Sequence, residues 1–193
     1  MEKSKTGGCV NSNDVDTPSV YTRTAVTLHW LVALLIAAGI TLGAVMTGLS
    51  MSPEKVRLFA YHKWIGITVL GLVLLRLLWR LTHTVPADVP MPRWQSVAAH
   101  LTHWLLYVLM IATPMVGWLY TSATGYPVVY LKMWQLPDLV AKNADLAKVL
   151  VQVHHVLAWT LLGVVLLHAA AALKHHFLDR DVTLKRMLAW RRA

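Results

Sequence analysis

The sequence contains little of what most soluble domains are built from. Charged residues make up only 14% of its 193 positions, against about 25% in an ordinary soluble domain. A single cysteine, Cys9, excludes an internal disulfide and any C-x-x-C motif. Only nine residues are acidic, and none of them lies inside the long apolar runs. A solvated surface of mixed charge is therefore missing from most of the chain.

Four long apolar stretches take its place. The mean hydropathy is +0.52 and 56% of the residues are hydrophobic. A helix needs about 20 apolar residues to cross a bilayer, and the stretches 25–47, 61–81, 99–121 and 149–173 each satisfy this length. We predict an all-α integral membrane protein, a four-transmembrane-helix bundle embedded in lipid.

The first twenty residues differ from the rest. They are polar, rich in Gly, Ser and Asn, and show no apolar periodicity, which predicts a disordered tail over 1–20 and no signal peptide. The membrane domain is expected to occupy 21–193. We assign no role to Cys9.

The distribution of Lys and Arg predicts the orientation. Cytoplasmic flanks of membrane helices carry an excess of these residues. Twelve of the 18 fall in the tail and the start of the first helix, at the end of the second stretch and in the connection after it, and in the C-terminal segment. Both termini are therefore expected in the cytoplasm. The basic residues flank spans and form no separate domain, which argues against nucleic-acid binding.

Histidines inside the spans are the most informative residues, because ionisable groups at membrane depth usually mark functional sites. His154 and His168 are 14 residues apart, which is about 21 Å along a helix and within roughly 40° of one face. His155 lies roughly 140° from that face. His62 matches the depth of His154 at the outer end, and His29 matches that of His168 at the inner end.

Two histidine pairs at two depths favour two haem groups, because neutral imidazole is a common axial ligand of haem iron. A metal transporter is the main alternative, but such sites tend to add carboxylates and thiolates, which the spans lack. His100 and His103 could replace His29 as the inner ligand, or lie at the interface as ordinary polar residues. The small residues Ala169–Ala172, Gly66, Gly39 and Gly43 would admit a wide haem, or simply allow close helix packing.

Polar residues at the inner end complete the candidate site. Arg76 and Arg80 return to nearly the face of His62 and could pair haem propionates or a quinone carbonyl. Positive-inside topology alone would also place them there. His175 lies seven residues beyond His168, where an imidazole could bind a quinone and pass it a proton. His176 has no assigned role.

These residues resemble the bacterial cytochrome b561 family, small four-helix dihaem b proteins of the inner membrane. The matching pieces are Thr27-Leu28-His29-Trp30, Tyr61-His62, the arginines of RLLWRL, Ala99-His100-Leu101-Thr102-His103, and LHAAAALKHHF with His154 upstream. The resemblance covers about Tyr21 to Ala193. It implies that His29 and His168 ligate an inner haem b, and His62 and His154 an outer one.

Within the family, the sequence is especially similar to members that oxidise superoxide at the periplasmic face and reduce ubiquinone. The resemblance implies an oxidoreductase with two haem b groups and with ubiquinone as substrate or bound acceptor. It implies that His175 and Arg76 lie near the quinone. One alternative is an electron-transfer subunit that links the quinone pool to a separate periplasmic redox protein. The other is a haem-free metal transporter.

Overall fold

The computed structural model describes residues 20–188, so the expected disordered tail and Cys9 fall almost wholly outside the described residues. Its four long helices are α1 (Arg23–Thr47), α2 (Pro53–Thr82), α3 (Arg93–Thr124) and α4 (Ala144–Phe177). A short hairpin of β1 (Val129–Tyr130) and β2 (Trp134–Gln135) precedes α4, and α5 (Lys185–Leu188) follows it. All four long helices are long and apolar enough to cross a membrane. The predicted four-helix membrane protein is confirmed.

The helices extend beyond the apolar runs because polar caps start them earlier. Ser52 accepts a hydrogen bond from the backbone N–H of Lys55, and Pro53 occupies the first turn. Asn143 caps α4 in the same way. The helix starts expected from the stretches 61–81 and 149–173 were therefore too late in the sequence. His62, His154 and His155 lie more than two turns inside their helices.

The helices pack in the order α1, α2, α3, α4, with α1 along α2, α2 along α3, and α3 along α4. The shared core lies near mid-depth. It contains nine buried residues: Val32, Ile36, Val69, Val73, Leu106, Tyr107, Leu109, Met110 and Leu161. Large apolar side chains such as Leu34, Leu101 and Val156 are exposed on the outside, where lipid would cover them.

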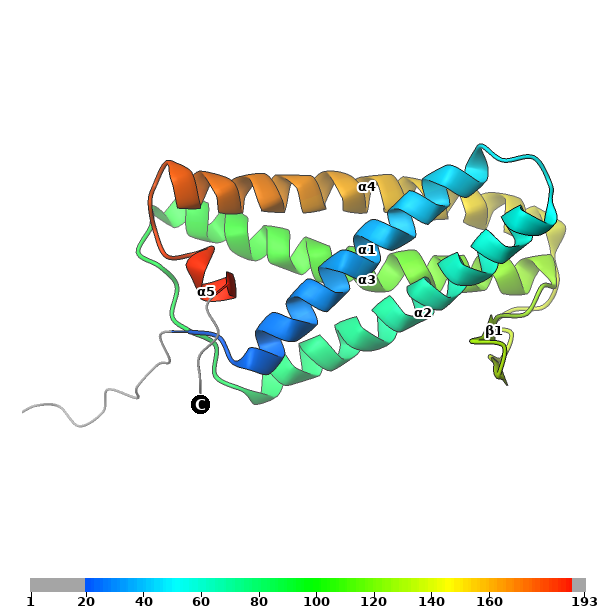
Figure 1. Ribbon diagram of the computed structural model, residues 1–193, viewed down its shortest axis with the longest axis horizontal. Helices are drawn as coiled ribbons and strands as arrows, with labels where there is room; N and C mark the ends of the chain where they lie inside the picture. The colour runs from blue at the N-terminus through cyan, green and yellow to red at the C-terminus, as the bar shows by residue number, and fades with distance from the viewer. Residues whose placement is uncertain (1–19, 189–193) are drawn as a thin grey trace, which may run out of the picture.

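The bundle has two distinct ends (Figure 1). At the inner end α1 begins, α4 ends and α5 lies beside them, while the α1–α2 loop and the hairpin lie at the outer end. The placement of the inner end in the cytoplasm stays a prediction.

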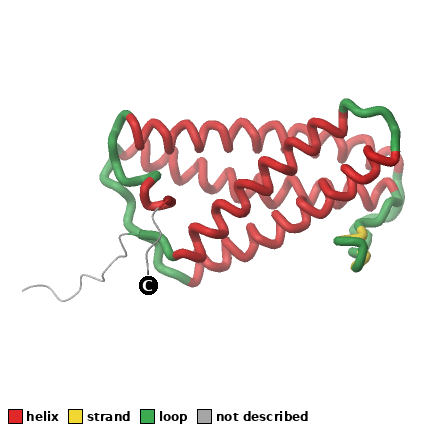
Figure 2. Tube along the Cα trace, in the orientation of Figure 1, coloured by secondary structure: helices red, strands yellow, loops and turns green. Residues whose placement is uncertain are grey.

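The hairpin, drawn as the only yellow segment among the described residues in Figure 2, is fixed to α2. Val129 pairs with Gln135 and Tyr130 with Trp134. The Trp64 indole donates to the Val129 carbonyl at 2.7 Å, and the hydroxyls of Thr68 and Tyr130 lie 2.8 Å apart. The outer connection is therefore held by hydrogen bonds to a transmembrane helix.

The segment after α4 folds back over the inner end of the bundle. The Trp30 indole donates to the carbonyl of Met187 at 2.9 Å. The Arg186 guanidinium donates to the carbonyl of Ala87 at 2.6 Å. This segment is thereby tied both to the start of α1, next to His29, and to the connection before α3.

Candidate functional site

The outer histidine pair joins α2 to α4. The ring centroids of His62 and His154 are 6.0 Å apart, and the ring planes are nearly perpendicular at 87°. Nδ1 of His62 lies 3.0 Å from the Gly39 carbonyl oxygen, and Nδ1 of His154 lies 3.0 Å from that of Thr113. A carbonyl only accepts, so each Nδ1 carries the proton and donates. Each Nε2 is left as the nitrogen with a free lone pair.

Two cavities adjoin this pair. One, of about 350 Å³, lies between all four helices, and its lining includes Gly39, Gly43 and Gly66 as well as both imidazoles. The other, of about 410 Å³, is lined by the same imidazoles and by Lys55 and Lys63. Cofactor sites usually occupy roughly 300–1,000 Å³. The outer pair therefore has room beside it for a large apolar group with an anionic edge near two lysines.

The spacing of the outer rings fits a metal ion between them. Imidazole nitrogens bind transition metals at about 2.0–2.1 Å, so two such ligands on opposite sides of one ion separate their ring centroids by roughly 6 Å. His62 and His154 match that separation. With both Nδ1 atoms bonded to the backbone, these two residues suit axial ligation by Nε2.

At the inner end the structure brings together three imidazoles. The ring centroid of His168 lies 6.3 Å from that of His29, with the planes at 63°, and 5.3 Å from that of His103. The first separation again fits a metal ion between the rings, whereas the second is short for one. The geometry therefore favours His29 over His103 as the partner of His168.

The predicted arginines lie close to this inner cluster. Arg76 is within electrostatic range of His29, His103 and His168. Its Nε donates to the hydroxyl of buried Tyr107 at 3.3 Å. Both Arg76 and Arg80 line a small cavity of about 40 Å³. Arg76 is half-buried and Arg80 is exposed, so Arg76 is better placed to act on a bound group.

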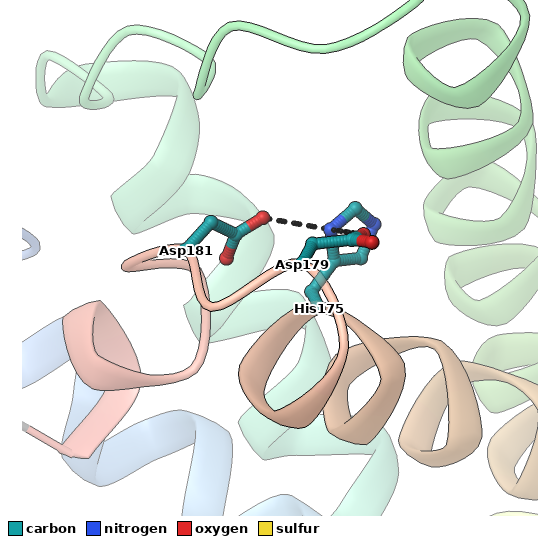
Figure 3. Close-up of side chains that lie close together, drawn as sticks. All are labelled: His175, Asp179 and Asp181. Carbon is teal, nitrogen blue, oxygen red and sulfur yellow. Dashed lines mark hydrogen bonds and ion pairs between the residues drawn. The ribbon is translucent and has the colours of Figure 1, made fainter.

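His175, in the last turn of α4, has a carboxylate partner (Figure 3). Its Nδ1 lies 2.7 Å from Oδ2 of Asp181 and 3.1 Å from Oδ2 of Asp179. Asp179 is also paired with Lys174 at 2.6 Å. Burial raises the pKa of Asp181, but hydrogen bonds from Thr183 and His175 outweigh it, so that this pKa lies below its ordinary value. Asp181 is therefore an ionised acceptor at neutral pH.

Two further histidines, His100 and His155, lie in simpler surroundings. His100 is exposed, hydrogen-bonds the Ser96 carbonyl and approaches Asp88 at 3.6 Å, as an interfacial residue would. His155 is exposed beside the outer pair and lines both outer cavities. The side chains of Ala169, Ala170 and Ala171 are exposed on α4, so a role for them beside a cofactor stays a prediction.

Several residues that complete these sites were not found from the sequence. Asp181 and Tyr107 interact with His175 and Arg76 across 6 and 31 residues, and no motif links such partners. Gly117 lies directly against the ring of His154. The sequence does contain a signal for Gly117. It lies four residues after Thr113, just as Gly43 lies four residues after Gly39.

Comparison with known proteins agrees with this geometry. The sequence profile described as prokaryotic cytochrome b561 matches residues 20–190. "Cytochrome b561 homolog 2" of Escherichia coli (strain K12) is 33% identical over 184 residues, which covers 90% of this chain and 93% of that protein. "Cytochrome b561 homolog 1" of the same organism is 30% identical over 178 residues, with 89% and 98% covered.

A third relative carries a more specific name. "Probable superoxide oxidase CybB" of Yersinia pestis is 35% identical over 178 residues, covering 86% of this chain and 93% of that protein. The resemblance seen in the sequence is confirmed at the level of the family. The chain belongs to the prokaryotic cytochrome b561 family, whose members are multi-pass proteins of the bacterial inner membrane that bind b-type haem and transfer electrons.

Proposed function

We propose that the protein holds two b haems, one at each histidine pair, and transfers electrons from superoxide at the outer end to ubiquinone at the inner end. The observation that carries the proposal is the pairing of α4 with two different helices. His154 meets His62 of α2, and His168 meets His29 of α1. One helix therefore contributes a ligand to each of two sites stacked along its length.

When bound, each haem supplies a one-electron carrier. The chain's part is to hold and orient these groups. His62, His154, His29 and His168 are the proposed axial ligands, and Arg76 and Arg80 are the proposed partners of propionates or of the quinone. The absence of acidic residues and cysteine from the apolar stretches keeps competing metal ligands away from these sites.

The balanced reaction is two superoxide ions plus ubiquinone plus two protons, giving two molecules of oxygen and ubiquinol. Each superoxide loses one electron, and the quinone gains both electrons together with two protons. Lys55 and Lys63 line an outer cavity beside His62 and His154 and would attract an anion. His175 at the inner end would hydrogen-bond the quinone and hand on a proton arriving from the cytoplasm.

The second candidate function keeps only the membrane electron transfer that belongs to the family as a whole. In it the protein is a cytochrome b subunit that exchanges electrons between the quinone pool and a separate periplasmic redox protein. It predicts slow reaction with superoxide and a partner that stays bound after gentle solubilisation.

Stopped-flow spectroscopy tests the proposal. Superoxide should reduce the haems of the purified protein rapidly, and added ubiquinone should reoxidise them. Slow reduction by superoxide with rapid reoxidation by quinone would favour the electron-transfer subunit. A preparation without the α band of a reduced b-type haem would overturn both and leave the metal transporter.

A further inference from the structure

The two outer imidazoles have matching surroundings on neighbouring helices. Nδ1–H of His62 on α2 donates to the carbonyl of Gly39 on α1. Nδ1–H of His154 on α4 donates to the carbonyl of Thr113 on α3. Both bonds measure 3.0 Å. In both helix pairs, α1–α2 and α3–α4, the histidine is thus oriented by the same kind of hydrogen bond, from Nδ1–H to a backbone carbonyl of the neighbouring helix.

The residue four positions after each acceptor is glycine. Successive positions i and i+4 lie one above the other on a helix face, so this residue faces the imidazole that binds the carbonyl. A Cβ atom on Gly117 would lie 3.1 Å from Cε1 and 3.2 Å from Nδ1 of His154, and one on Gly43 would lie 3.4 Å from Cε1 of His62. We call each carbonyl with its glycine a seat.

Backbone conformation does not explain these glycines. Both lie inside helices, and Gly125 is the only glycine with positive φ in the described part of the chain. Glycine inside a helix is less favourable than alanine, so its presence requires another reason. At Gly71 and Gly163, by contrast, a Cβ would meet nothing within 4 Å.

We propose that Gly117 is a positioning residue for the outer ligand His154, and that Gly43 is its looser counterpart at His62. Resting on the proposed haem ligation, this inference adds that bare backbone at Gly117 lets the His154 ring approach the Thr113 carbonyl. At Gly43 a Cβ would make an ordinary contact with His62, so only a larger side chain is excluded there. The Nδ1–H bond fixes the tautomer and the rotation of the ring, and it strengthens Nε2 as a ligand. A methyl group at 117 would push the His154 ring away from the Thr113 carbonyl and turn it from its present plane.

The inner pair has no such seat. None of the described glycines would place a Cβ within 4 Å of His29 or His168. A substitution at a seat should therefore affect one haem and leave the other unchanged, which separates this effect from general loss of packing.

The test compares Gly117→Ala with Gly163→Ala and Gly71→Ala. Each variant is purified from membranes, its haem content is measured, and its two haems are followed by electron paramagnetic resonance and by redox titration. The signal of ferric haem with two imidazole ligands depends on the angle between the ring planes, which differs between the outer and inner pairs. We expect Gly117→Ala to shift or remove the outer signal alone, and the two controls to match the wild type.

An unchanged outer signal in Gly117→Ala would overturn the inference. Equal loss of both haems in Gly117→Ala and in the controls would also overturn it, because the cause would then be helix packing. If Gly117→Ala does not accumulate in membranes, Gly43→Val makes the same test at His62, and an unchanged outer signal there overturns it. A wild-type protein without two haems would instead refute the proposed function.

Discussion

Nδ1 of His175 donates to a carboxylate oxygen of Asp181 at 2.7 Å, and both side chains are largely buried, with 16% and 17% of their surface exposed. The carboxylate is held in turn by the Thr183 backbone N–H at 2.8 Å. This arrangement leaves Nε2 as the free nitrogen of the His175 ring. His175 therefore presents one defined atom at the inner end of the bundle.

Replacement of His175 should separate the two halves of the reaction. His175→Ala is expected to keep both haems and their reduction by superoxide, but to slow their reoxidation by ubiquinone by about 10²-fold, as for loss of an acid–base group. Stopped-flow measurement of each half-reaction checks this. Unchanged reoxidation would move the quinone site elsewhere, and loss of a haem would mean that the ligands are assigned wrongly.

Asp181 should affect the reoxidation of the haems by ubiquinone only through its hydrogen bond with His175. Asp181→Asn replaces a charge-assisted hydrogen bond with a weaker neutral one, so reoxidation by ubiquinone should slow less than in His175→Ala. Combining both substitutions should cause no further loss, because residues in one network are not additive. Asp179→Asn tests the second carboxylate, which lies 3.1 Å from the same nitrogen but is also paired with Lys174, and should slow reoxidation less than Asp181→Asn. A full additional loss in the double variant would show that Asp181 acts independently.

Alanine substitutions should distinguish the two proposed outer ligands from the neighbouring His155. His62→Ala or His154→Ala should each remove the outer haem and leave about half of the pigment, whereas His155→Ala should leave both haems bound. The pyridine haemochrome assay of purified protein measures this. If His155→Ala removed a haem and His154→Ala did not, the assignment of the α4 ligand would be wrong.

A similar prediction concerns which histidine of the inner cluster is the partner of His168. His29→Ala should remove the inner haem, and His103→Ala should retain both haems, because only the His29–His168 separation of 6.3 Å fits a metal ion between the rings. The haem content of each variant, together with the spectrum of the remaining haem, decides whether His29 or His103 is the inner ligand. The opposite pattern would make His103 the ligand.

Ionic strength should affect the outer reaction. Six basic residues (Lys55, Arg57, Lys63, Lys132, Lys142 and Lys148) and three acidic ones (Glu54, Asp138 and Asp145) lie towards the outer end. Such an excess attracts an anion over roughly 8–10 Å, and salt screens it. Raising the salt concentration should slow haem reduction by superoxide but not reoxidation by ubiquinone. A rate of reduction that is indifferent to salt would exclude electrostatic steering.

The sequence predicts much of this architecture, because hydropathy and helical periodicity are local properties. The four spans are confirmed, and His154 and His168 do lie near the histidines of α2 and α1 that match them in depth. Helix starts were misplaced because caps such as Ser52 and Asn143 extend a helix past its apolar run.

Contacts between distant segments could not be predicted. The hydrogen bond between Trp64 and Val129 that holds the hairpin, and the bond between Trp30 and Met187 that holds α5, join residues 65 and 157 positions apart. The proximity of His103 to His168 also depends on how α3 and α4 cross. Spacing within one helix carries no information of this kind.

The placement of one histidine from each pair on α4 also limits how this chain can change in length over evolution. Each residue added to or deleted from a helix rotates everything beyond it by about 100°. A single insertion between His154 and His168 would therefore turn one of these side chains away from its partner while the other stayed in place. Insertions between Thr124 and Ala144, where α3 has ended and α4 has not begun, would not rotate one of these histidines relative to the other. Natural relatives should differ in length in that connection and keep the spacing of 14 within α4.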